Sequence, residues 1–169
     1  FFSKIFNYDD KSLLLIIGIT SILFGFLLYI FDRFCLTLKG NEELSFITSF
    51  LTGIFQCLAL IPGVSRSGSI IIFLRFLGYN RNFVVFFSNL LSIPVILAAT
   101  FFIIFQNQEI FLLTDYLNFY TIGVFIFSLI FSLIFLQFLV FWVRKSSFLI
   151  FAIYRIFFGS ILIYLFFVN

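Results

Sequence analysis

Four long apolar runs constrain this chain more than any other feature. They cover residues 13–31, 83–105, 119–143 and 148–167. A helix needs about 20 apolar residues to cross the hydrocarbon core of a bilayer. The chain is 63% hydrophobic and 10% charged, whereas a soluble domain is roughly half apolar and about a quarter charged. The sequence therefore predicts a single all-α transmembrane domain over residues 1–169, a polytopic bundle of membrane-spanning helices.

A fifth apolar region, residues 47–78, is built differently. Its two apolar stretches, Gly53 to Leu60 and Ile70 to Leu77, are each too short to cross a bilayer. A polar, glycine-rich loop separates them, from Ile61 to Ser69. Non-helical backbone inside the hydrocarbon region must be surrounded by protein or by a water-filled cavity. The pattern therefore predicts a re-entrant helix–loop–helix hairpin, which enters the membrane and turns back.

The backbone of this loop is expected to be tightly turned. Pro62 cannot continue a helix and favours extended geometry at Ile61. Gly63 and Gly68 permit left-handed turns and the close approach of a ligand. The loop is thus suited to presenting backbone groups to a small molecule.

The polar side chains of the loop are suited to an anion, most simply a phosphate. Arg66 carries five fixed N–H donors that match phosphate oxygens. Ser67 or Ser69 is expected to cap the second short helix, whose N-terminus favours negative charge. In the alternative interpretation, Arg66 only reaches the membrane surface and the serines only cap a helix. The candidate anion-binding residues are Gly63, Ser65, Arg66, Ser67, Gly68 and Ser69.

Four polar side chains in apolar segments are candidates to lie around the loop: Gln56, Ser88, Ser92 and Arg155. A polar group in such surroundings needs a hydrogen-bond partner. Ser88 and Ser92 share one helix face. In the alternative interpretation, both only bond back to their own backbone. An arginine within a membrane span usually marks function. Arg155 either points into the bundle or reaches the interface.

Several residues in or next to the spanning helices are expected to shape how those helices pack and bend. Gly18 and Gly25 lie a heptad apart, where they allow a close helix crossing or form a smooth face toward lipid. Asp32 and Arg33 follow the first span and are expected to pair at the interface. Pro94 should kink the second span.

The composition also excludes several kinds of site. The chain has no histidine, and Cys35 and Cys57 have no metal-ligand or redox spacing, so no metal site is expected in it. Its cations are scattered, which argues against nucleic acid as a partner. Glu42 and Glu43 are expected to be solvated.

The run from Gly53 to Gly68 strongly resembles the second signature of bacterial undecaprenyl-diphosphate phosphatases, the bacitracin-resistance family. Residues 88–94 (Ser-Asn-Leu-Leu-Ser-Ile-Pro) resemble a further stretch of that family. Residues 153–159 resemble its last helix, and residues 25–34 resemble a helix end ahead of the signature.

The resemblance implies a hydrolase of the bacterial inner membrane. Such an enzyme removes the terminal phosphate of a polyprenyl diphosphate and recycles the carrier lipid for peptidoglycan synthesis. It thereby supports cell shape, cell-wall biogenesis and bacitracin resistance. The implied fold is an inverted repeat with two re-entrant hairpins, of which this chain would hold one half. Whether such a protein forms a homodimer is left open by the resemblance.

The resemblance also implies roles for loop residues. Ser65, Arg66 and Ser67 match the pyrophosphate-binding signature, with Gly63 and Gly68 shaping the loop. Arg66 would stabilise charge on the transferring phosphoryl group. Ser65 is a candidate nucleophile, although no base for it is visible in the chain.

Two departures from the family pattern matter. Ile70 stands where the family usually has a threonine. The family's first signature, two glutamates and a histidine, is missing, and those glutamates would hold a divalent metal, Mg²⁺ or Ca²⁺. The chain therefore looks like the C-terminal portion of such a protein and is expected to be inactive alone.

Two other classes of function remain open. Re-entrant hairpins with polar tips also build the sites of transporters and channels. A flippase or anion carrier for the same lipid would use the same arginine. The hairpin of a purely structural subunit would only pack against its neighbours.

Overall fold

A computed structural model describes residues 10–38, 44–106, 118–145 and 147–168. Glu42 and Glu43, for which a solvated position is predicted, lie outside these residues. The described residues form helices joined by short connections and no β-strand element. The four longest helices are α2 (Asp10–Phe34), α5 (Arg81–Gln106), α7 (Phe119–Lys145) and α8 (Leu149–Val168).

Each long helix follows one of the four apolar runs, to within a few residues at its ends. All four are long and apolar enough to cross a membrane. The chain is therefore an all-α polytopic membrane protein. Helix α5 continues through Pro94, and a kink there stays a prediction.

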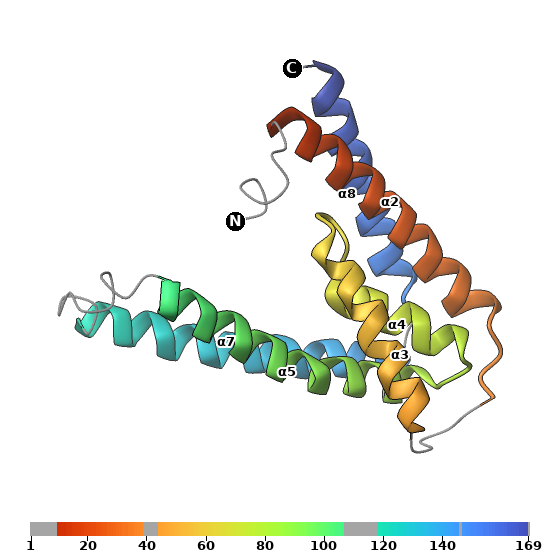
Figure 1. Ribbon diagram of the computed structural model, residues 1–169, viewed down its shortest axis with the longest axis horizontal. Coiled ribbons are helices and arrows are strands. Elements are labelled where there is room, and N and C mark those ends of the chain that lie inside the picture. Colours follow the sequence, from red (N-terminus) through yellow and green to blue (C-terminus); the bar gives the residue numbers. More distant parts are fainter. Residues whose placement is uncertain (1–9, 39–43, 107–117, 146, 169) are drawn as a thin grey trace.

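The helices form two arms that diverge from a common base (Figure 1). Helix α2 packs along α8 in one arm, and α5 packs along α7 in the other. The predicted hairpin lies in the angle between the arms. It consists of α3 (Phe46–Cys57), a 3-10 turn (Leu58–Leu60) and α4 (Arg66–Phe76). That it enters the membrane without crossing stays a prediction.

Helix α4 is the buried centre of the fold. It contacts α2, α3 and α5. Ile70 and Leu74 are completely buried, in a cluster that includes Val84 of α5. A helix that is apolar on all sides is expected to be enclosed by other elements. The loop that precedes α4 is therefore held against the long helices on both sides.

Small residues set the close approach of α2 and α8. A Cβ atom added to Gly159 would lie 2.7 Å from the carbonyl oxygen of Gly18. A Cβ atom added to Gly25 would lie 3.1 Å from the carbonyl oxygen of Ala152. Of the two predicted roles for Gly18 and Gly25, the close helix crossing is therefore confirmed.

Replacing Gly159 by alanine is expected to destabilise the α2–α8 pair by about 1–3 kcal/mol, the usual cost of overpacking. The added methyl group meets a backbone carbonyl, which cannot rotate away as a side chain can. Thermal unfolding of the full-length protein in detergent measures the loss. The matched control is Gly123→Ala in α7, where an added Cβ has nothing within 4 Å. Equal unfolding temperatures for the two variants would contradict this account of the crossing.

A buried carboxylate joins the base of both arms. Asp32, at the end of α2, accepts hydrogen bonds from Arg81 Nε at 2.7 Å and Arg81 Nη2 at 3.1 Å. Its Oδ2 also accepts from the backbone N–H of Phe148, directly before α8, at 3.0 Å. Arg75 Nε of α4 lies 3.4 Å from Oδ1, an ion pair without hydrogen-bond geometry. One side chain thus ties together four helices.

The predicted pairing of Asp32 with Arg33 is wrong. Arg33 is exposed, whereas Asp32 is 5% exposed and faces Arg75 and Arg81. Neighbours in a helix point in directions about 100° apart, so Asp32 turns inward and Arg33 outward. Arg75 is buried too, and its remaining N–H groups donate to carbonyl and hydroxyl oxygens, among them Tyr79 O at 2.8 Å.

Candidate functional site

The loop between α3 and α4 is folded against α2. Ile61 has extended backbone angles, φ −76° and ψ 127°, as predicted from Pro62. Gly63 has φ +88°, a conformation that favours glycine. A Cβ atom there would collide with Thr20 Oγ1 and with the backbone of Ile17. The hydroxyl of Thr20 donates to the carbonyl oxygen of Pro62 at 2.8 Å.

Ser65, rather than Ser67 or Ser69, caps helix α4. Its Oγ accepts from the backbone N–H of Gly68 at 3.1 Å and lies 3.2 Å from Ser67 Oγ. Ser69 Oγ donates instead to Arg66 O at 2.8 Å and is fully buried. The predicted caps lie two and four residues too late, because the helix already begins at Arg66.

Gly68 allows another side chain to approach helix α4 closely, and it does not form a left-handed turn. It lies within α4, and its φ is not positive. A Cβ atom added there would lie 3.1 Å from Ser65 Cβ and 3.3 Å from Arg155 Nη1. Glycine at this position therefore lets the guanidinium of Arg155 approach the first turn of α4.

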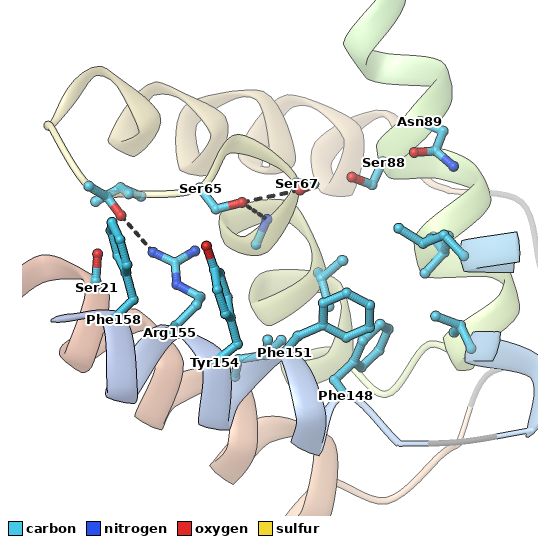
Figure 2. A pocket seen from close by; sticks show the side chains of 18 of the residues that line it. Ser21, Ser65, Ser67, Ser88, Asn89, Phe148, Phe151, Tyr154, Arg155 and Phe158 are labelled. Carbon is cyan, nitrogen blue, oxygen red and sulfur yellow. Dashed lines mark hydrogen bonds between the residues drawn. The ribbon is translucent and has the colours of Figure 1, made fainter. Parts of the chain in front are cut away.

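Arg155 points from α8 into the loop, which decides between its two predicted orientations (Figure 2). Its Nη2 donates to the carbonyl oxygen of Gly63 at 2.6 Å. Its Nε–H is buried and finds no hydrogen-bond partner among the described residues. The guanidinium therefore retains donor capacity while it anchors the turn.

A cavity of about 490 Å³ opens between the two arms at this point. Gly63, Ser65, Ser67, Gly68 and Arg155 line it on the loop side, and Ser88 and Asn89 of α5 line it farther away (Figure 2). Ser88 is 2% exposed, and its Oγ has no partner within the described part of the chain. Most other lining side chains are apolar, including Phe148, Phe151 and Phe158.

Four of the predicted residues lie outside the lining of this cavity: Gln56, Arg66, Ser69 and Ser92. Arg66 is half-buried, and its Nη1 donates to the carbonyl oxygen of Ser92 at 3.4 Å. Ser92 Oγ bonds back to Asn89 O at 2.6 Å, as its simpler interpretation predicts. Ser88 makes no such bond. In this structure the cation on the cavity wall is Arg155.

The sequence interpretation missed Ser21, which is buried and lines the cavity from α2. The available signal was its spacing. Gly18, Ser21 and Gly25 fall on one helix face. A serine between two interface glycines therefore faces the partner helix and the cavity beside it.

Within the described ranges, no three His, Cys, Asp or Glu side chains lie together in a way that could hold a metal ion. The polar groups on the cavity wall are hydroxyls, an amide and a guanidinium, which do not fit a divalent cation. A metal thus stays a prediction from resemblance.

A known protein family matches almost the whole of this chain. The family model described as bacitracin resistance protein BacA matches residues 1–161. The chain belongs to the BacA family. Membership in this family, together with the four spanning-length helices, identifies a multi-pass protein of the bacterial inner membrane.

Several curated relatives carry the name undecaprenyl-diphosphatase. One from Campylobacter jejuni subsp. jejuni serotype O:23/36 (strain 81-176) is 39% identical over 131 residues, 77% of this chain and 48% of the relative. One from Leptospira biflexa serovar Patoc (strain Patoc 1 / Ames) is 34% identical over 163 residues, 94% of this chain and 56% of the relative. The chain therefore spans about half the length of the curated relatives it matches.

Proposed function

We propose that the full-length protein to which this chain contributes hydrolyses a polyprenyl diphosphate to the monophosphate and phosphate. The observation that carries the proposal is the cavity wall, on which Arg155 meets the capped start of α4 at Ser65. Guanidinium and hydroxyl donors suit a diphosphate. The apolar remainder of the cavity suits a lipid. The names of the relatives support the same reaction.

The chain's own residues would bind and orient the headgroup. Arg155 donates to phosphate oxygens from the cavity wall, and Ser65 and Ser67 add hydroxyl donors. The first N–H groups of α4 have no partner within the helix and favour an anion. Positive charge held in place lowers the free energy of a phosphoryl group as it transfers. Ser65 is the proposed nucleophile within this chain. Its Oγ would bond to the terminal phosphorus as the bond from that phosphorus to the bridging oxygen breaks, so that the lipid monophosphate leaves and a base elsewhere in the full-length protein takes the hydroxyl proton. Water would then cleave the phosphoserine, which releases phosphate and restores the serine.

Arg66 is assigned to the same headgroup site. Its single hydrogen bond to Ser92 O is long at 3.4 Å, so little is lost when its guanidinium turns toward a diphosphate. The chain alone is expected to be inactive, because the two glutamates and the histidine of the family's first signature are missing from it. A divalent metal, Mg²⁺ or Ca²⁺, would be held by residues of the full-length protein that this chain does not contain. Any homodimer would likewise form between full-length proteins.

The decisive experiment measures phosphate release by the purified full-length protein in detergent with undecaprenyl diphosphate as substrate. Release of one phosphate per lipid supports hydrolysis. A transporter or flippase would bind the lipid through the same residues and release none. A fragment limited to residues 1–169 is expected to release no phosphate on its own.

Replacing Arg66 by alanine in the full-length protein is expected to lower phosphate release by about 10–100-fold, the worth of one hydrogen bond to a charged group. Arg66→Lys should recover part of this loss, because lysine keeps the charge but not the planar fork. The matched control is Arg33→Ala, which removes an exposed arginine at the end of α2. Near-normal turnover in both Arg66 variants would remove Arg66 from the site.

A further inference from the structure

A second cavity lies next to the first, between α5 and α7, and has a volume of about 410 Å³. Its walls are mainly apolar, with Leu90, Ile93, Leu136 and Val140 along its length. We call this second cavity the α5–α7 groove. Nothing in the proposed headgroup chemistry uses it.

The groove adjoins the first cavity, in which the proposed diphosphate headgroup lies and which we call the headgroup cavity. Val85, Asn89 and Val143 line both of them. Val85 and Val143 are 4% and 3% exposed, so this junction is deep in the fold. Figure 2 places Asn89 at the end of the headgroup cavity that lies away from Arg155. A ligand anchored at Arg155 would therefore reach the groove by its far end.

The groove also opens outward. Ile93 is 54% exposed and Leu136 is 46% exposed, and both belong to helices long enough to span a membrane. The polarity falls from donors at Arg155 and Ser65 to apolar side chains along α5 and α7. A molecule with an anionic head and a long apolar tail has this distribution of polarity.

We propose that the α5–α7 groove binds the prenyl tail of the lipid diphosphate whose headgroup lies at Arg155 and Ser65. This inference rests on the proposed function, because that function supplies the headgroup position. A tail that leaves lipid for an apolar groove gains little hydrophobic free energy, since lipid chains are as apolar as leucine. The groove therefore aligns the lipid rather than adding bulk affinity. It sets a preference for long chains over short ones.

The test is to fill the groove from a position remote from the headgroup. Leu136→Trp places an indole in the groove, and Ile134→Trp is its control on the opposite face of α7, at 56% exposure. In the full-length protein, kcat/KM is measured for undecaprenyl diphosphate and for geranyl diphosphate, whose tail is much shorter. We expect Leu136→Trp to lower kcat/KM for the long substrate by about tenfold, the smallest discrimination usual for a misfit in an apolar pocket. The kcat/KM for geranyl diphosphate should not change.

Equal behaviour of Leu136→Trp and Ile134→Trp would overturn the tail site, as expected if another part of the full-length protein covers the groove. An equal fall in kcat/KM for both substrates would overturn it too, because the headgroup site would then be disturbed.

A second measurement does not depend on turnover or on a folded variant. A polyprenyl diphosphate with a photoreactive group on its tail should label the unaltered full-length protein on α5 and α7 around Ile93 and Leu136. Labelling confined to other helices overturns the tail site. Labelling of the groove in a protein that releases no phosphate keeps the tail site and contradicts the proposed hydrolysis.

Discussion

Replacing Arg155 by alanine in the full-length protein is expected to lower turnover of undecaprenyl diphosphate by about 10²–10³-fold, the usual effect of removing a positioned donor from a site of developing charge. The loss should exceed that of Arg66→Ala, because Arg155 does two things. It lines the cavity, and its buried Nε–H has no partner among the described residues. It also holds the left-handed turn through its 2.6 Å bond to Gly63 O.

Two further variants separate binding from support of the fold. Arg155→Lys keeps the charge but cannot bond the turn and a phosphate at once with a planar fork, so it should recover KM more than kcat. Ser160→Ala, one turn farther along α8, removes an exposed hydroxyl that only bonds its own backbone. It should leave both constants unchanged. Normal turnover in Arg155→Ala would show that the headgroup is bound elsewhere.

Replacing Asp32 by alanine is expected to destabilise the full-length protein by about 3–5 kcal/mol, the cost of breaking a buried ion pair from one side. The variant leaves the guanidinium of Arg75, 2% exposed, without a carboxylate. It also removes the acceptors of Arg81 and of the Phe148 N–H. Thermal unfolding in detergent, followed by tryptophan fluorescence and by size-exclusion recovery, measures the effect.

The neighbouring residue provides the control. Arg33→Ala removes an exposed charge and should shift stability by less than about 0.5 kcal/mol, as surface substitutions usually do. Asp32→Asn keeps an acceptor for the Phe148 N–H but loses the charge, so it should fall between the two. If Asp32→Ala and Arg33→Ala unfold at the same temperature, the carboxylate does not hold the arms together.

Much of the fold was predictable because it depends on local composition. The lengths of the apolar runs predict α2, α5, α7 and α8, and the two short runs predict separate helices on either side of the loop. Pro62 predicts the extended backbone at Ile61 by local sterics. The α4 cap was placed too late because Ser65, Ser67 and Ser69 are equally good caps by type. Only the helix start at Arg66 distinguishes them.

The candidate site was predictable only in part. Gly63, Ser65 and Ser67, which line the cavity, were predictable because they lie close together in a polar stretch between apolar segments. The sequence favoured Arg66 over Arg155 as the phosphate-binding arginine because Arg66 lies within the polar loop. In the structure, Arg155 occupies the cavity wall, and Arg66 contacts α5. Ser21 was missed although its spacing from Gly18 and Gly25 places all three residues on one helix face.

The sequence by itself determined that this chain is a membrane protein of long helices with one interrupted, polar hairpin. Those properties follow from hydrophobic length and from the backbone limits of proline and glycine, which act over a few residues. Tertiary structure alone decided which hydrogen-bond partner each buried charged side chain finds. Asp32 bonds Arg81 across 49 residues, and Arg155 bonds Gly63 O across 92. Such pairs depend on how closely glycine-lined helices cross and on which faces they bury, and no local pattern contains that information.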